Sequence, residues 1–256
     1  MRSIAILGLL VVAGVASAQD ATPLKPGQGL PDAVVNSYLA KWEEHMAKVT
    51  GVTSKCVLIE DDGTEKKKFV GDIAVLKPNY LRLVLKSDDD PKNEKKWRVI
   101  LVDGTDVWEL DYRAKIARVR ALPADGLKHP ALAVLLGGKA ADLQKRYELS
   151  IDPERALRDS NYLAISIRPK TKEDQQDMVK AELVLWQNEK DEKFKNHWML
   201  PARLWFQQPN QEQITWLFLD PTPADLIKAD FVVPKLPADW KTERQPAEAR
   251  PVGRPK

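Results

Sequence analysis

The stretch 75–112 decides the fold, and it reads VLKPNYLRLVLKSDDDPKNEKKWRVILVDGTDVWELDY. Two runs rich in β-branched and aromatic residues flank Asp103-Gly104, and an Asp-Gly pair in that setting is a strong hairpin signal. The Lys-Pro-Asn sequence at 77–79 predicts a second tight turn, because proline fixes φ and asparagine tolerates a left-handed conformation. We therefore expect three or four antiparallel strands here, joined by short connections.

Further strands are expected on both sides of this meander. Those at 51–59 and 67–76 are joined through another Asp-Gly pair at 62–63. The later ones are expected at 116–122, 147–152, 162–168, 181–187, 200–207 and 213–219. The pattern predicts a mainly β (α+β) protein with about 11 strands.

Helices are expected to cover one face of this sheet. Residues 32–49 carry one apolar stripe with charged residues off it, which predicts an N-terminal amphipathic helix. The segment 129–138 is short and apolar and ends in two glycines, which is typical of a helix C-terminus, and 140–146 predicts another short helix. Several strands, such as 69–76, are apolar on both faces, so they need such a cover.

The N-terminus predicts export. Arg2 precedes an apolar run at 4–13 and a small-residue cleavage site at 16–18, so we interpret 1–18 as a signal peptide. The run is shorter than the about 20 residues that a transmembrane helix needs, and we expect no transmembrane span in the mature chain. We expect a flexible linker at 19–30, one domain at 31–240 and a disordered Pro/Arg-rich tail at 241–256.

Composition and motifs give no indication of catalysis. Lys and Arg total 40 against 37 acidic residues, and no basic stripe with interleaved aromatics suggests a nucleic-acid partner. Cys56 is the only cysteine, lies in an apolar run and is expected to be buried and inert. The three histidines have no metal-ligand spacing, and there is no nucleophilic serine motif. Glu109 and Asp111 share one strand face, but outward polar positions explain them better than an acid–base pair. We expect no catalytic residue, no metal and no cofactor.

The eight tryptophans indicate how the interior is used. Trp108, Trp186, Trp205 and Trp216 lie on predicted strands with apolar residues on both faces. A large curled sheet with helices on its concave side can leave an apolar cavity for a ligand. A fully packed core explains the same pattern, and both alternatives remain open at this stage.

The order of motifs resembles the periplasmic Lol-type outer-membrane lipoprotein carrier superfamily. The likeness extends from about residue 30 to 240. Its motifs are the signal peptide, the N-terminal helix, Gly71-Asp72-Ile73 leading to Lys77-Pro78-Asn79-Tyr80-Leu81-Arg82, Val102-Asp103-Gly104 before Val107-Trp108, the His129-Pro130-Ala131 helix ending at Leu135-Leu136, Ile167-Arg168-Pro169-Lys170, and Phe231 with Pro234 and Pro237. The chain departs from the family in its longer loop at 86–96 and its charged C-terminal tail.

This resemblance implies a strongly curved, incomplete antiparallel β-barrel with an N-terminal helix and short lid helices over an apolar cavity. It further implies a periplasmic carrier for acyl chains of lipoproteins or lipids, and we expect a monomer. The residues expected to line the cavity and its lid are Leu39, Trp42, Met46, Tyr80, Arg82, Leu83, Trp108, Leu132, Leu135, Leu136, Trp186, Trp205 and Trp216. The alternative is a periplasmic envelope-stress regulatory protein that docks a protein partner on the same curved sheet.

Overall fold

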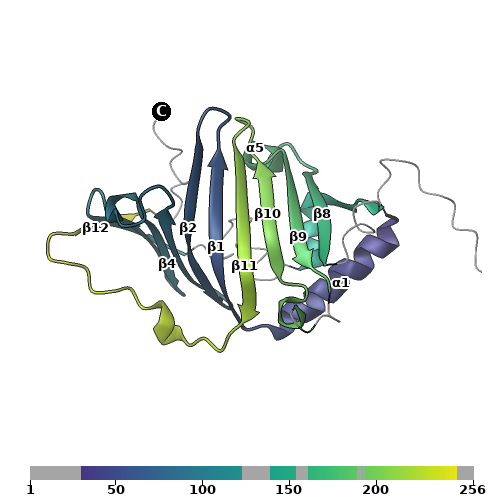
Figure 1. The fold of residues 1–256 in the computed structure, drawn as a ribbon, viewed down its shortest axis with the longest axis horizontal. Coiled ribbons are helices and arrows are strands. Elements are labelled where there is room, and N and C mark those ends of the chain that lie inside the picture. Colours follow the sequence, from purple (N-terminus) through teal and green to yellow (C-terminus); the bar gives the residue numbers. More distant parts are fainter. Residues whose placement is uncertain (1–29, 123–138, 154–160, 189–191, 193, 247–256) are drawn as a thin grey trace, which may run out of the picture.

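In the computed structural model, one twelve-stranded sheet curves around an N-terminal helix (Figure 1). The structure describes residues 30–122, 139–153, 161–188, 192 and 194–246. The strand order is β12-β6-β5-β4-β3-β2-β1-β11-β10-β9-β8-β7, so β12 and β7 are its two edges and the barrel is not closed. The expected fold, a curved and incomplete β-barrel, is confirmed.

The helices and strands follow the predicted order closely. The helical elements are α1 (Asp32–Lys48), η1 (Glu94–Lys96), α3 (Ala140–Arg146), α5 (Asp174–Asp177), η2 (Lys195–His197) and η3 (Lys228–Phe231). The strands are β1 (Gly51–Asp61), β2 (Lys66–Leu76), β3 (Tyr80–Ser87), β4 (Arg98–Asp103), β5 (Asp106–Asp111), β6 (Ile116–Ala121), β7 (Tyr147–Ile151), β8 (Tyr162–Pro169), β9 (Lys180–Trp186), β10 (Pro201–Gln207), β11 (Gln213–Pro223) and β12 (Lys241–Gln245).

The predicted Asp-Gly turn joins β4 to β5, and Asp103 builds it. Its Oδ1 accepts hydrogen bonds from the backbone N–H groups of Thr105 (3.0 Å) and Asp106 (2.8 Å), while Gly104 has a φ of 94°. Only glycine adopts such a φ without strain, so these two residue types specify the turn. Trp108 Nε1 donates to Asp103 Oδ2 at 3.0 Å, which ties the next strand to the same carboxylate.

The sheet is antiparallel throughout, apart from the parallel pairing of β12 with β6. At the centre, β1 pairs with β2 on one side and β11 on the other. Between β2 and β3, Gly71 allows a close approach, because a Cβ there would lie 1.7 Å from the carbonyl oxygen of Val84. A side chain at this position would push the two strands apart.

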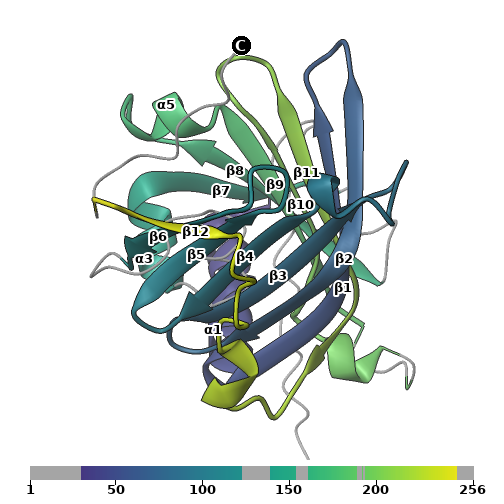
Figure 2. The ribbon, with the colours of Figure 1, turned by 90° about the vertical axis from the view of Figure 1, so that its left-hand side faces the viewer.

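α1 lies on the concave side of the sheet, as Figures 1 and 2 both show. It begins after Pro31 and has Asp32 in its first turn and Lys48 in its last, charges that complement the helix dipole. Val35, Leu39, Trp42 and Met46 are buried, so the predicted stripe faces the sheet. Together with the concave side chains of β1–β5 and β7–β11 they form the main hydrophobic core.

A second, smaller core lies on the outer face of β4–β6. Val99, Leu101, Leu110 and Ala117 are buried there. Residues 224–245, which we name the strap, run over them and place Val233, Leu236 and Trp240 on this core. Figure 2 shows the strap crossing the outer side of β3–β5 before it pairs with β6 as β12.

The finer expectations from the sequence have different outcomes. The short helix predicted at 140–146 is present as α3, and Cys56 is buried, as expected. The helix predicted at 129–136 lies outside the described residues. The structure differs from the sequence interpretation at 241–245, which we assigned to a tail and which forms β12, bringing the strand count to twelve. Hydrogen bonds to β6 supply the order that the polar sequence of this segment did not predict.

In the described part of the chain, no helix is both long and apolar enough to cross a membrane.

Candidate functional site

The concave site is the apolar surface of the sheet that α1 covers. Trp42 lies at the centre of the helix and is almost fully buried. Its indole Nε1 is buried without a hydrogen-bond partner among the described residues, and the same holds for Nε2 of His45. A buried donor or acceptor left unpaired costs about 1–3 kcal/mol, so the contact between α1 and the sheet carries a penalty.

His45 lies at the margin of this contact. Its ring meets the ring of Trp198 edge to face, with 5.1 Å between the centroids. Burial, followed by the charges of Lys48 and Lys77, lowers the pKa of His45. The imidazole is therefore neutral near pH 7 and adds no charge to the concave site.

Polar contacts hold α1 along its rim. The backbone N–H of Ala140 donates to Glu43 Oε2 at 3.3 Å, and Gln144 Nε2 donates to Asn36 Oδ1, both from α3. Lys77, in the turn between β2 and β3, donates to the carbonyl oxygen of Met46 at the C-terminal end of the helix. Hydrogen bonds thus hold α1 at its periphery, while its central residues pack on apolar side chains.

Beyond the core residue Val107, the concave face of β5 and β6 carries charged side chains. Arg118 donates to Asp111 at 3.2 Å and Arg120 donates to Glu109 at 3.2 Å. By register Glu109 faces Ile100, which packs on the main core, so the two carboxylates lie on the concave side. They point into the curve of the sheet, paired with arginines, and are not the outward polar positions that we expected.

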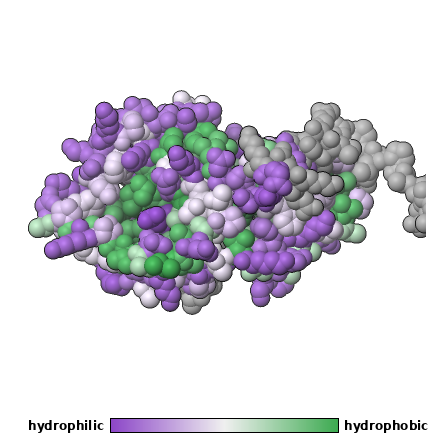
Figure 3. Space-filling view, turned by 60° about the horizontal axis from the view of Figure 1, so that its bottom comes forward, coloured by the Kyte–Doolittle hydropathy of each residue, from purple (hydrophilic) through white to green (hydrophobic). Residues whose placement is uncertain are grey.

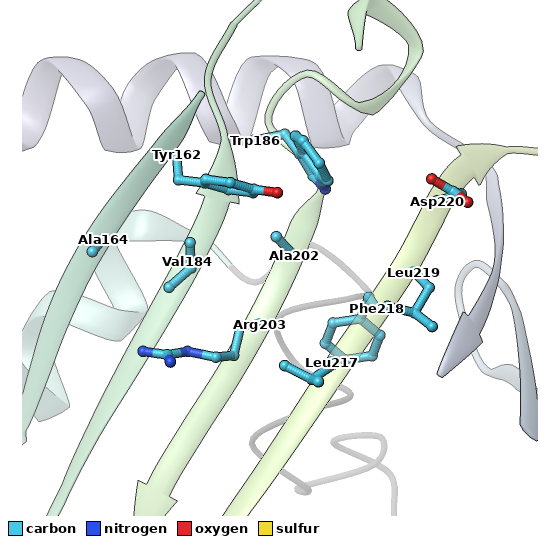
Figure 4. A pocket seen from close by; sticks show the side chains of 10 residues that line it. All are labelled: Tyr162, Ala164, Val184, Trp186, Ala202, Arg203, Leu217, Phe218, Leu219 and Asp220. Atoms are coloured by element: carbon cyan, nitrogen blue, oxygen red, sulfur yellow. The ribbon is translucent and has the colours of Figure 1, made fainter. Parts of the chain in front are cut away.

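Two grooves lie on the opposite, outer face of the sheet. The first, which we name the apolar groove, has a volume of about 570 Å³ and crosses β8–β11. Its lining is Tyr162, Ala164, Val184, Trp186, Ala202, Arg203, Leu217, Phe218, Leu219 and Asp220 (Figure 4). Figure 4 shows these side chains, apart from that of the core residue Phe218, on the side of the strands that faces away from α1.

The second groove, which we name the cationic groove, has a volume of about 700 Å³ and continues across β1–β3. Leu219 and Asp220 border both grooves, so the two are contiguous. Its other lining residues are Thr53, Ser54, Lys55, Asp72, Ile73, Ala74, Arg82, Val84, Lys86 and Thr222. It therefore holds three cationic side chains and, with Asp220, two carboxylates.

Aromatic rings close one end of the apolar groove. The ring of Trp186 lies 4.5 Å from that of Tyr162 and stacks on Phe194 at 4.8 Å, measured between centroids. His197 lies 5.4 Å from Trp186 and shares a 2.7 Å hydrogen bond between its Nδ1 and the carbonyl oxygen of Pro221. These contacts fix the indole of Trp186, which is 8% exposed.

The structure does not bring the predicted site residues together on one face. Register and burial place five on the concave side, namely Leu39, Trp42, Met46, Leu83 and Trp216. They place five others on the outer face, namely Tyr80, Arg82, Trp108, Trp186 and Trp205. Leu132, Leu135 and Leu136 lie outside the described residues. Because the sheet separates the two sets of described residues, they cannot line the same cavity.

Sequence reasoning missed the outer grooves. The run Trp216-Leu217-Phe218-Leu219 on β11 was their signal, since it supplies apolar side chains to both faces. Leu217 and Leu219 alternate with the core residues Trp216 and Phe218 and so face outward. We interpreted two-sided strands as evidence for a cover on one face and did not consider a groove on the other.

Comparisons with known proteins concern the fold. No protein-family profile matches the chain, and no curated protein matches it. An uncharacterized conserved protein from Thermus thermophilus is similar in structure (TM-score 0.47, 10% identity, covering 82% of this chain and 99% of that one). So is a LolA superfamily protein from Nitrosomonas europaea (TM-score 0.39, 12% identity, 77% and 97%).

A putative outer membrane lipoprotein-sorting protein domain from Vibrio parahaemolyticus is also similar (TM-score 0.36, 10% identity, covering 75% of this chain and 94% of that one). The structures similar to the chain thus include members of the superfamily that its sequence motifs resemble. At these identities and TM-scores the likeness says nothing of a ligand or a partner.

Proposed function

We propose that this chain is an exported, periplasmic binding protein that carries acyl chains of lipids or lipoproteins. One acyl chain would lie on the concave face, in the place that the buried stripe of α1 occupies in this structure. Leu39, Trp42 and Met46 would move aside with the helix, and Leu83 and Trp216 would form part of the floor. The function is binding and transport, with no catalytic step.

One observation carries this proposal. The largest apolar surface of the described chain lies on the concave face, and at its centre the cover is a single helix. Among the described residues, the indole N–H and the imidazole nitrogen that this helix buries have no hydrogen-bond partner, so its contact with the sheet is not optimal. A hydrocarbon chain has no polar group to leave unpaired, and it could cover the same surface without that penalty.

The free energy lost when the α1 stripe leaves the concave face is similar to the free energy gained when an acyl chain binds there. The four buried side chains of the α1 stripe contribute roughly 6–12 kcal/mol, at about 1.5–3 kcal/mol for each side chain. An acyl chain of about 16 carbons gains on the order of 10 kcal/mol, at about 0.8 kcal/mol per methylene. Binding by exchange with α1 would therefore be reversible, which a carrier requires because it must also release its cargo.

The test is to lock α1 in place. Asn36 on α1 and Gln144 on α3 are in hydrogen-bond contact, so Asn36→Cys with Gln144→Cys can be joined by a short bis-methanethiosulfonate linker. α3 runs directly into β7 and is held by the ion pair of Arg146 with Asp174, so it provides a fixed anchor. Cys56 does not interfere, because burial raises the pKa of its thiol to about 12.

We expect the lock to weaken binding of a fluorescent palmitoylated peptide at least tenfold, measured by anisotropy, and reductant to restore it. The matched control is Gln207→Cys with Gln211→Cys, a pair in hydrogen-bond contact at the turn between β10 and β11. That linker should leave binding unchanged. If the locked protein binds the palmitoylated peptide as well as the open one, the concave site is not the acyl site.

The alternative function, docking of an envelope protein, has one observation in its favour. Ile227 and Val232 of the strap are 63% and 69% exposed. Figure 3 shows apolar surface gathered on the half of the molecule that carries β1–β6 in Figure 1. Mass spectrometry of protein purified from cells separates the two functions: bound acyl species support carriage, whereas a stoichiometric protein partner that Ile227→Glu releases supports docking.

A further inference from the structure

We propose that the two outer grooves form one binding site for an anionic amphiphile with a single alkyl chain. The alkyl chain lies along the apolar groove over β8–β11, and the carboxylate or phosphate head lies in the cationic groove over β1–β3. This site is distinct from the concave one, because the sheet stands between them.

The apolar half has the composition and size of a hydrocarbon site. Val184, Ala202, Leu217 and Leu219 come from three adjacent strands and leave a floor of small and aliphatic side chains. Leu219 is 44% exposed, so its side chain is accessible to a ligand in the groove. The volume of about 570 Å³ falls in the range of small-molecule sites.

The cationic half supplies the head-group contacts. Lys55 projects from β1, and Arg82 and Lys86 project from β3. Arg82 is positioned by a 3.4 Å hydrogen bond from Nη1 to the carbonyl oxygen of Asp230, and Lys86 Nζ lies 4.5 Å from the ring centroid of Trp97. Neither contact neutralises the cation, so both charges remain available to an anion.

Two carboxylates share this groove, and they limit the charge that it presents. Asp72 lies opposite Lys55 across the β1–β2 pairing, and Asp220 stands at the border with the apolar groove. The groove keeps one positive charge in excess, so an anionic head is favoured over a cationic one. A ligand with one negative charge and one alkyl chain is therefore complementary to this site, which has one apolar and one cationic half.

Together, the apolar groove and the cationic groove are long enough for an alkyl chain and its head group. They meet at Leu219 and Asp220, and the line from β8 to β3 crosses six strand spacings, which amounts to about 29 Å. An extended amphiphile can therefore lie across the strands with its two ends in different surroundings.

The ends of the chain itself are poorly suited to occupy this site. The C-terminal residues 247–256 carry Arg250, Arg254 and Lys256 against Glu248, so they are cationic like the groove. The apolar N-terminal run at 4–13 has only Arg2 as its charged neighbour. Charge complementarity therefore favours an anionic ligand in the groove over either of these segments.

The experiments use the protein in which Asn36→Cys and Gln144→Cys are cross-linked, so that α1 closes the concave face. The first experiment compares four probes with the same alkyl length by calorimetry, below their micelle concentrations: dodecanoate, dodecyl phosphate, dodecyltrimethylammonium and dodecyl maltoside. We expect the two anions to bind at least tenfold more tightly than the other two. Preference for dodecanoate over dodecyl phosphate indicates a free fatty acid as the natural ligand, and the reverse indicates a phospholipid head. Equal affinity for dodecyltrimethylammonium overturns the proposal.

The second experiment alters the grooves without touching the core. Ala202→Trp fills the apolar floor, and Lys55→Glu with Lys86→Glu reverses the charge of the head site. We expect each change to weaken dodecanoate binding at least tenfold. The controls are Ala141→Trp on the exposed side of α3, and Lys139→Glu with Lys172→Glu, exposed positions that do not line either groove. Unchanged binding in Ala202→Trp overturns the proposal.

The α1 lock separates this site from the concave one. With Asn36→Cys and Gln144→Cys cross-linked, dodecanoate should still bind the grooves, and Ala202→Trp should still abolish that binding. If the lock alone removes all dodecanoate binding, the ligand occupies the concave face and the groove proposal fails. A different outcome is that the lock leaves binding of the palmitoylated peptide unchanged while the groove variants abolish dodecanoate binding. In that case the carrier proposal fails and the groove proposal stands.

Discussion

Cys56 shows how burial at a single residue makes stability depend on pH. Its thiol is buried on β1, and burial, together with the nearby charge of Asp72, raises its pKa from 9.0 to about 12. The folded state therefore holds the thiol proton more tightly than the unfolded state. The resulting stability is complete below pH 9 and is lost as the pH rises from there towards 12.

We expect the free energy of unfolding to fall by up to about 1.4 kcal/mol per pH unit above pH 9 because of this thiol. Urea unfolding of the native chain and of Cys56→Ala at pH 8 and pH 10 measures it. The alanine variant should lose less stability than the native chain between the two pH values. An equal loss in both would show that other groups, such as Tyr112 and Tyr147, account for the pH dependence.

Asp174 gives the opposite dependence on pH. Its carboxylate is 8% exposed and accepts hydrogen bonds from Arg146 Nε (2.9 Å) and Thr171 Oγ1 (2.8 Å). The hydrogen bonds from Arg146, opposed in part by burial, lower the pKa of Asp174. The stability it contributes is present above pH 4 and is lost as the pH falls through the lowered pKa of the folded state.

Asp174→Asn should therefore destabilise the chain by about 1–3 kcal/mol at pH 7, because it weakens hydrogen bonds to a buried carboxylate. The difference from the native chain should shrink below pH 4, measured by thermal unfolding at several pH values. Asp142→Asn is the matched control and should change stability much less, since Asp142 pairs with Lys145 on the exposed side of α3, where solvent screens the two charges.

At the scale of the element, α1 is the helix whose side chains fill the concave face. Trp42→Ala should cost about 3–5 kcal/mol of unfolding free energy, because it leaves a cavity between α1 and the sheet. Trp205→Ala removes the same side chain from the half-exposed outer face and should cost about 1 kcal/mol. Urea unfolding compares the two; similar costs would contradict the packing described for α1.

The elements themselves were largely predictable from local sequence. The Asp-Gly pairs fixed two hairpins because glycine alone enters the required φ, 84° at Gly63 and 94° at Gly104. The α1 stripe was visible as a 3.6-residue period ending before Gly51. β12 was not predictable, because Lys241–Gln245 has no apolar period and is ordered by its hydrogen bonds to β6.

At the scale of the whole molecule, the face on which each strand residue lies was harder to predict. Trp108 and Trp216 look alike in sequence, yet Trp108 packs on the outer core and Trp216 on the concave one. Alternation separates the two faces of a strand but does not say which face is concave. Which face is concave is decided by long-range packing, with α1 on one side of the sheet and the strap on the other. For this reason only part of the candidate site could be predicted from the sequence.

The strap makes the outer core possible, because it covers apolar side chains that a one-sided sheet would expose to water. Phe231 is almost fully buried with its ring 5.6 Å from that of Tyr80, and Trp240 meets Tyr112 edge to face at 4.9 Å. Beyond these anchors, Arg244 pairs with Asp106 at 3.1 Å. The strap is therefore a structural part of the domain and not an appended tail.

Truncation tests this role. A chain that ends at Lys235 lacks β12 and Trp240 and uncovers Leu101, Leu110 and Ala117 on the outer face. It should bind a dye for exposed apolar surface, lose about 3 kcal/mol or more of stability, and self-associate, because a patch of this kind is not stable in water and β6 becomes an open edge. The control ends at Pro246 and keeps every described strap contact. It should remain monodisperse by light scattering and as stable as the full chain. If the Lys235 truncation behaved like this control, the outer core would not depend on the strap.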